Sequence, residues 1–216
     1  MSASGSSSCN NKNFIQSNLN IIYTNADSFV NKREELIVFL QSLTVKPAAI
    51  IITEVNPKAS CEGLQESEFS LTGYKIYSVN VGTSGKRGII VYIDALLNSC
   101  EINVTSDFSE YIILKIYLEK ENTLHLGAFY RSPASNINND ENLLSLLDAI
   151  CRNSRQNIIL IGDFNHKHID WVNYVADTNS SISEKKFVTN LQDNLLTQTV
   201  TFSTRARLMF LQPLTL

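Results

Sequence analysis

The chain has 216 residues, of which 44% are hydrophobic and 18% charged, and its formal net charge is −3 at pH 7. This size and composition are typical of a globular protein with a substantial core, and the slight acidity excludes a protein that holds nucleic acid through a general excess of basic residues. Four widely spaced cysteines, Cys9, Cys61, Cys100 and Cys151, argue against a zinc site or a disulfide framework and indicate a reducing compartment.

The N-terminal segment is rich in serine and lacks the apolar stretch of a secretory signal. We expect residues 1–17 to form a disordered leader. No apolar run approaches the roughly 18 residues that a membrane-spanning helix needs. The protein is therefore expected to be intracellular, nuclear or cytoplasmic, with no membrane partner.

Two strands and a helix are predicted in the first quarter of the chain. The β-branched and aromatic residues of 19–25 predict a strand, and the fully apolar segment 48–54 predicts a second, central one. Between them, apolar residues with the i, i+3, i+4, i+7 spacing of an amphipathic helix are Leu36, Phe39, Leu40 and Leu43. Asp27 or Ser28 is expected to cap this helix.

The middle of the chain has the pattern of two β-hairpins. Residues 74–80 and 87–94 flank a glycine-containing turn, and residues 111–118 and 123–130 flank a polar one. A helix, a strand and a second helix are then predicted over residues 140–151, 157–164 and 183–194. Hairpins combined with helices predict an α/β layered fold with mixed sheets.

Four of the predicted strands end in polar residues that an apolar strand does not require: Asn25, Glu54, Tyr130, Asp163 and Asn165. Ligands of α/β sheets bind beyond the carboxyl ends of strands, so we expect one pocket to hold two carboxylates, two carboxamides and a phenol. Asp163 and Asn165, two positions apart in an extended segment, are expected to project to the same side.

This set of groups suits the cleavage of a phosphate ester. Glutamate is a suitable ligand for Mg²⁺, which prefers oxygen ligands, and an aspartate beside it can orient or deprotonate an attacking water. Amide and phenol groups donate hydrogen bonds to phosphate oxygens. Taken singly, each residue has a simpler interpretation as a turn former, a solvated edge residue or a core aromatic. Only the combination indicates a site.

The same segments resemble a known family. In order and spacing, NIIYTNADS, AAIIITEV, GAFYRSP and IILIGDFNHKHIDW resemble the endonuclease domain of non-LTR retrotransposons, over roughly residues 19–206. That domain is a member of the endonuclease/exonuclease/phosphatase superfamily, with the apurinic endonucleases and the DNase I-like enzymes. The resemblance implies a two-sheet mixed β-sandwich flanked by helices, in four layers. It also implies a magnesium-dependent DNA endonuclease that nicks a target site, with a reverse transcriptase domain downstream in the intact element.

The resemblance further implies roles for the strand-end residues. Glu54 would be the principal magnesium ligand with Asn25 beside it, Asp163 would act on the water, and Asn165 and Tyr130 would hold the scissile phosphate.

Other residues receive less definite expectations. Asp27 falls where the apurinic enzymes carry an acid beside the metal. Lys86, Arg87 and Arg131 are expected to touch the DNA backbone, with a solvated surface as the alternative for the first two. His166 is either half of a His-x-His ligand pair or part of a solvated loop.

The sequence departs from the family pattern near its C-terminal end. The family's closing Ser-Asp-His motif is absent, and residues 208–216 have the character of an aberrant apolar tail or a displaced strand. The expectation is a C-terminally truncated domain over residues 18–207 that lacks its last strands and has weak or no activity. Alternatives are a non-catalytic remnant of a mobile-element polyprotein and a phosphoesterase of the same fold that acts on lipid or inositol phosphates.

Overall fold

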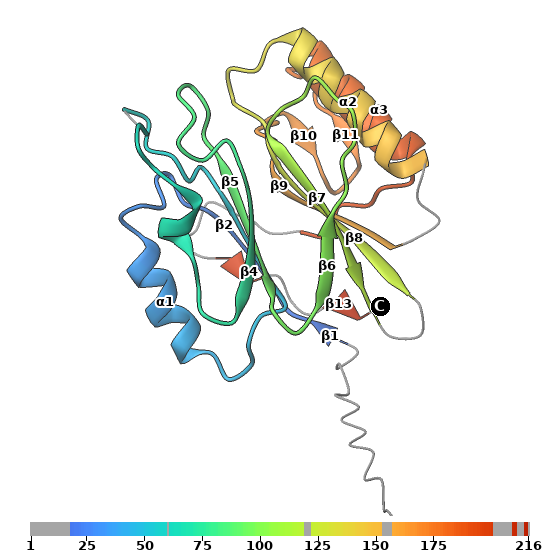
Figure 1. The fold of residues 1–216 in the computed structure, drawn as a ribbon. Helices are drawn as coiled ribbons and strands as arrows, with labels where there is room; N and C mark the ends of the chain where they lie inside the picture. Colours follow the sequence, from blue (N-terminus) through green and yellow to red (C-terminus); the bar gives the residue numbers. More distant parts are fainter. Residues whose placement is uncertain are drawn as a thin grey trace, which may run out of the picture.

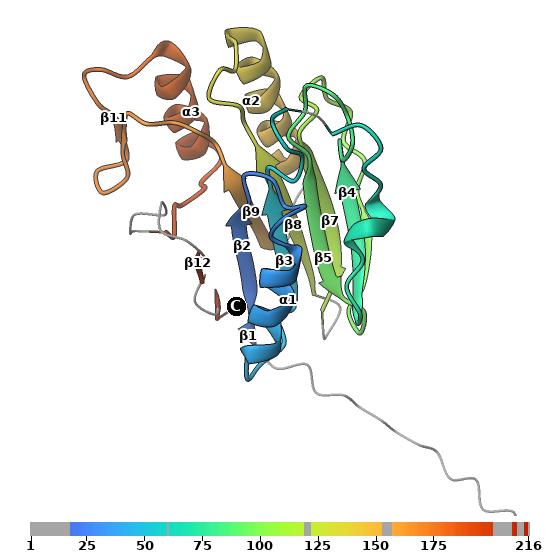
Figure 2. The ribbon, with the colours of Figure 1, turned by 90° about the vertical axis from the view of Figure 1, so that its left-hand side faces the viewer.

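Two mixed β-sheets pack face to face, with helices on both outer sides (Figure 1, Figure 2). The computed structural model describes residues 18–59, 61–118, 122–152, 157–200, 209–210 and 214–215. The predicted leader and most of the predicted apolar tail lie outside the described residues. No helix of the described part of the chain is long and apolar enough to cross a membrane.

The first sheet has the strand order β12-β2-β3-β5-β4. Its strands are β2 (Ile21–Asn25), β3 (Ala49–Thr53), β4 (Tyr74–Val79), β5 (Ile89–Asp94) and the short β12 (Met209–Phe210). Strands β2 and β3 are parallel, and the other pairs are antiparallel. Three predictions are confirmed here: the first strand, the central position of β3, and the β4–β5 hairpin.

The second sheet has the strand order β6-β7-β8-β9, and only β8 and β9 are parallel. Its strands are β6 (Asn98–Glu101), β7 (Tyr111–Tyr117), β8 (Thr123–Tyr130) and β9 (Asn157–Asp163). Two small ribbons complete the strand pairing, β1 (Asn18–Leu19) with β13 (Leu214–Thr215) and β10 (Ile169–Asp170) with β11 (Val175–Ala176). The polar strand β6 has no apolar alternation, and the sequence did not predict it.

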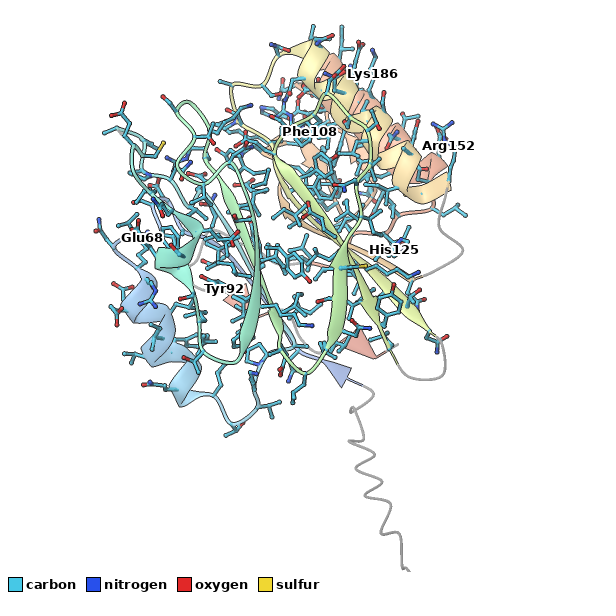
Figure 3. All side chains as sticks on the ribbon, in the orientation of Figure 1. Glu68, Tyr92, Phe108, His125, Arg152 and Lys186 are labelled. Carbon is cyan, nitrogen blue, oxygen red and sulfur yellow. The ribbon has the colours of Figure 1, made fainter. Side chains whose placement is uncertain are left out.

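The alternation of side chains along each strand divides the core into three parts. In β3, Ile51 faces the second sheet, whereas Ile50 and Ile52 face the helix α1 (Arg33–Ser42). Tyr92 belongs to this α1-side core, and Phe108 belongs to the core beneath α2 (Ile137–Arg152) and α3 (Ile182–Asp193) (Figure 3). The result is the predicted four-layer arrangement of helix, sheet, sheet and helices.

The start of α1 differs from the prediction. The helix begins at Arg33 rather than after Ser28, and its N-cap residue, Lys32, makes no side-chain capping bond. Asp27 and Ser28 have φ angles of 43° and 83°, whereas an N-cap residue typically has a β-region backbone. Their loop instead binds the end of β3, because the Ser28 N–H donates to the Glu54 carbonyl at 2.8 Å.

The two parallel strand pairs bring four strand ends to one rim of the sandwich. Asn25 lies opposite Thr53, the last residue of β3, and Tyr130 lies opposite Asp163. Because the two strands of a parallel pair run in the same direction, each sheet presents two carboxyl ends together. This rim holds the candidate site.

Candidate active site

The side-chain amide of Asn25 joins two carboxylates at the rim. Its Nδ2 donates to Glu54 Oε1 at 2.8 Å and to Asp163 Oδ2 at 3.0 Å. These two oxygens therefore cannot be farther apart than the sum of those distances, 5.8 Å. The acids come from different sheets, Glu54 from the end of β3 and Asp163 from the end of β9, so the site lies where the two sheets meet.

Several residues of the rim have a left-handed backbone. The φ angles of Asp27, Glu54 and Asn165 are 43°, 54° and 50°. Asn and Asp accept this conformation more readily than other residues, whereas for Glu54 it is unusual. Backbone strain of this kind is concentrated at functional sites, where the surrounding structure holds it in place.

The segment after β9 turns back rather than continuing as a strand. Because Asn165 is left-handed, the expectation that it projects with Asp163 from an extended segment is wrong. The two residues still contact each other, since the Asn165 N–H donates to Asp163 Oδ1 at 3.0 Å. Nδ2 of Asn165 donates to the Arg131 carbonyl at 2.7 Å. Gly162 is required by the neighbouring strand, because a Cβ there would overlap the carbonyl oxygen of Phe129.

Tyr130 is near enough to Glu54 and Asp163 to interact with their charges. It is the last residue of β8, lies opposite Asp163 and is only 3% exposed. Burial raises the pKa of its phenol well above the usual value, and the negative charge of Glu54 adds to the shift. The phenol is therefore protonated at every physiological pH and is available as a hydrogen-bond donor.

The basic residues expected to touch DNA pair with protein groups. Arg87 donates through Nε to Glu54 Oε2 at 3.0 Å and through Nη2 to Asp27 Oδ1 at 2.8 Å. Nη2 also forms a short contact with Glu54 Oε2. Lys58 Nζ lies 2.9 Å from the same Asp27 oxygen, and this hydrogen bond is the largest cause that lowers the pKa of Asp27. Lys86 donates to Ser109 Oγ at 2.8 Å.

Arg131 is buried and pairs with an acid of α2. It is 6% exposed, and its guanidinium donates to both carboxylate oxygens of Asp140 at 2.7 and 2.9 Å. Nη1 reaches the carbonyls of Phe164 and Asn165 at 3.3 and 3.4 Å. Burial raises the pKa of Asp140, but hydrogen bonds, first that of Arg131, outweigh it and hold the pKa at about 2. The buried pair thus supports the turn after Asp163.

Buried Asn56 is a feature that the sequence reasoning missed. Its Nδ2 donates to the carbonyls of Asn80 and Lys86 at 2.7 and 2.9 Å, and its Oδ1 accepts the Gly82 N–H at 3.0 Å. These bonds tie the β4–β5 loop, which carries Arg87, to the end of β3. An asparagine before a proline is an ordinary loop signal, so the sequence gives no sign of this role.

The described contacts of the chain's three histidines are with groups other than Glu54 and Asp163. His166 packs on the ring of Phe187 with centroids 4.4 Å apart, and burial, followed by the charge of Arg131, lowers its pKa to about 4. Nδ1 of exposed His168 lies 3.5 Å from a carboxylate oxygen of Asp177. His125 lies in β8 on the second sheet (Figure 3). Among the described contacts, none joins a histidine to Glu54 or Asp163.

The low pKa of His166 predicts a loss of stability in mild acid. In the unfolded chain the imidazole of His166 binds a proton below about pH 6.5, whereas in the folded chain it does so only near pH 4. The free energy of unfolding therefore decreases as the pH falls between these two values. Because the ring is partly exposed, we expect a loss of about 1–2 kcal/mol rather than the full value for this shift. Urea unfolding at several pH values measures it.

The matched variants are His166→Gln and His168→Gln. The first should abolish most of the pH dependence between pH 6.5 and 4, and the second should retain it. An unchanged slope in His166→Gln would show that another group controls acid stability.

The rim suits an oxygen-ligated cation held by few protein groups. Among the described residues, no group of three or more His, Cys, Asp and Glu side chains is placed to hold a metal. Mg²⁺, however, commonly binds through one or two carboxylates, with waters and substrate phosphates as its other ligands. Glu54 and Asp163, joined through Asn25, provide that donor set, and none of the described contacts adds the Cys or His ligands that are typical of zinc sites.

The comparisons with known proteins agree with the fold and with the sequence motifs. Residues 113–208 match a family model described as Endonuclease-reverse transcriptase. No curated protein matches the chain. The match over 113–208 confirms the predicted resemblance to endonucleases that are associated with a reverse transcriptase.

Solved structures of similar fold include three nucleases. The endonuclease domain of TRAS1, a telomere-specific non-LTR retrotransposon, matches with a TM-score of 0.57 and 12% identity, over 82% of this chain and 72% of that one. The AP endonuclease LMAP from Leishmania major matches with a TM-score of 0.59 and 13% identity, over 82% and 67%. The 3'-5' exonuclease NExo from Neisseria meningitidis matches with a TM-score of 0.53 and 14% identity, over 82% and 71%. The DNase I-like fold predicted from the sequence is thereby confirmed.

Proposed function

We propose that this chain, which has the fold of the DNase I-like nucleases, is a magnesium-dependent DNA endonuclease domain of a retrotransposon, with weak activity. The observation that carries the proposal is the convergence of Glu54 and Asp163, from different sheets, on the single amide of Asn25. Metal-assisted hydrolysis of a phosphodiester uses one carboxylate to bind the cation and a second carboxylate beside it to accept a proton from the attacking water.

The resemblance to the retrotransposon endonucleases suggests a role for each residue of the rim. Glu54 and Asn25 would hold Mg²⁺, which would polarise a phosphate oxygen and neutralise its charge. In the described part of the chain, each oxygen of Asp163 accepts one N–H bond and retains a second acceptor position, so the carboxylate can accept a proton from an attacking water. Tyr130, whose phenol is protonated, and Asn165 would donate hydrogen bonds to the phosphate.

The weak activity follows from what surrounds Asp163. None of the described contacts brings a histidine to it, and His166 is held on Phe187 with its pKa lowered to about 4. No imidazolium is therefore placed to stabilise charge on the phosphate. Groups that stabilise developing charge contribute about two to three orders of magnitude in rate, so cleavage is expected to be slow.

DNA is the proposed substrate because the nucleases of similar fold include one solved with a product DNA hairpin. The family description, Endonuclease-reverse transcriptase, supports a link to a reverse transcriptase in the intact element. Within it, the domain would nick a target site before reverse transcription.

The test is the effect of Mg²⁺ on thermal unfolding. A cation that binds only the folded state raises stability by mass action, and Mg²⁺ at about ten times its Kd should contribute about 1.4 kcal/mol. For a domain of this size the melting temperature should rise by roughly 3–5 °C. Glu54→Gln should lose this rise, and Glu101→Gln, which changes an exposed acid at the end of β6, should keep it. Equal rises in wild type and Glu54→Gln would refute the proposed metal site.

A further inference from the structure

Arg87 occupies the carboxylate that the proposed function assigns to the metal. The residue lies in the loop between β4 and β5, where its N–H donates to Glu110 Oε1 at 3.0 Å and its carbonyl accepts the Asn56 N–H at 2.7 Å. Its side chain is 15% exposed and reaches Glu54 and Asp27. Both the backbone and the side chain of Arg87 therefore hold its guanidinium beside Glu54.

The hydrogen bonds of Glu54 leave little room for a metal. Each carboxylate oxygen has two acceptor positions. Among the described residues, Oε2 accepts two N–H groups of Arg87 and is saturated, whereas Oε1 accepts Nδ2 of Asn25 alone. A divalent cation would have to use the one remaining position of Oε1, beside a guanidinium that repels it, or displace Arg87 from Oε2.

Arg87 is itself incompletely satisfied in this arrangement. Its Nη1 is buried and has no hydrogen-bond partner among the described groups. A buried donor without an acceptor destabilises the arrangement that contains it. A phosphate, whose oxygens accept the paired N–H groups of a guanidinium, would satisfy Arg87 better than Glu54 and Asp27 do.

We propose that Arg87 couples metal binding to the arrival of a phosphodiester. In the free protein its guanidinium holds Glu54, and when a backbone phosphate binds Arg87, Glu54 is released to hold the divalent cation. This inference rests on the proposed function. Linkage requires the coupling to act in both directions, so DNA raises metal affinity and the metal raises DNA affinity by the same factor.

The test measures the affinity for Mn²⁺, followed by electron paramagnetic resonance of the free ion, with and without a saturating short DNA duplex. In the wild type, the duplex should tighten Mn²⁺ binding at least about tenfold, within the range usual for coupled sites. In Arg87→Gln, the free protein should bind Mn²⁺ at least about tenfold tighter than the wild type, and the duplex should add little, because the competing cation is gone.

Two further variants separate competition from other effects. Lys58→Gln removes a cation that pairs with Asp27, and no described contact joins Lys58 to Glu54. The Lys58→Gln variant should therefore bind Mn²⁺ with the affinity of the wild type. Arg87→Lys retains the charge and should retain weak binding in the free protein, which also covers the case that Arg87→Gln fails to fold.

The outcomes distinguish this inference from the proposed function. If Glu54→Gln abolishes Mn²⁺ binding but the duplex and Arg87→Gln leave the wild-type affinity unchanged, the metal site stands and the coupling is refuted. Equal tightening in Lys58→Gln and Arg87→Gln would also refute it, because a general charge effect would explain both. If no form of the protein binds Mn²⁺ with or without DNA, both proposals fail.

Discussion

Replacing Arg131 by methionine is expected to lower the free energy of unfolding by about 3–5 kcal/mol, because it leaves the buried carboxylate of Asp140 without its counter-ion. Both side chains of this pair are 8% exposed. Asp140 retains the hydroxyls of Ser135, at 2.6 Å, and of Ser183, which donate hydrogen bonds but carry no charge to neutralise it. Urea unfolding followed by circular dichroism gives the loss directly.

Arg152→Met is the matched control for Arg131→Met. Arg152 pairs with Asp148 at 3.4 Å on the surface of α2 (Figure 3), where an ion pair contributes about 0.3–0.5 kcal/mol at most. Changing Asp140 to leucine in the Arg131→Met background should recover part of the loss, since no unpaired charge then remains. Equal losses in Arg131→Met and Arg152→Met would contradict the supporting role of the buried pair.

Replacing Asp163 by alanine is expected to reduce magnesium-dependent nicking of DNA at least about a hundredfold, which is the lower end of what a positioned general base contributes. Relaxation of supercoiled plasmid is the suitable measurement, because one nick anywhere relaxes the molecule and slow cleavage is visible. The wild-type chain should need a large excess of protein over plasmid and should be inactive in a chelator.

The control variant for Asp163→Ala is Asp170→Ala. Asp170 follows in the same segment and is also acidic, but its carboxylate binds the residues of its own turn, such as Asn173 at 2.7 Å. Asp170→Ala should nick plasmid like the wild type. Equal nicking by Asp163→Ala and the wild type would show that the cleavage comes from a contaminant or from another site.

The apolar strands could be predicted because their patterns are local, whereas the polar strand β6 has no such pattern. The apolar run of β3 requires cover on both faces, and alternate residues of β5 pack into different cores. The start of α1 could not be predicted in this way. Asp27 is of a residue type that often caps helices. Its loop, however, is hydrogen-bonded to the end of β3, and this contact joins segments that are distant in the sequence.

The strand-end residues were recognisable for a similar reason, whereas their partners were not. Asn25, Glu54 and Asp163 each follow an apolar run, so a sequence pattern marks them. Arg87 and Arg131 carry no such mark, and their contacts depend on how the sheets and α2 pack. Sequence reasoning expected both arginines to touch the DNA backbone, and the structure shows each bonded to a carboxylate.

The amide bridge of Asn25 also bears on the order of folding. Asn25 and Asp163 are 138 positions apart in the chain, and each of the two sheets can pair its own strands without the other. Contacts between such distant segments form slowly, since a long loop must close before they can contribute. An intermediate with only one sheet formed would have either Glu54 or Asp163 in place, but not both. The site therefore forms only when the two sheets pack together. A chain in which one sheet alone has folded would lack a complete site and would not cleave a phosphodiester.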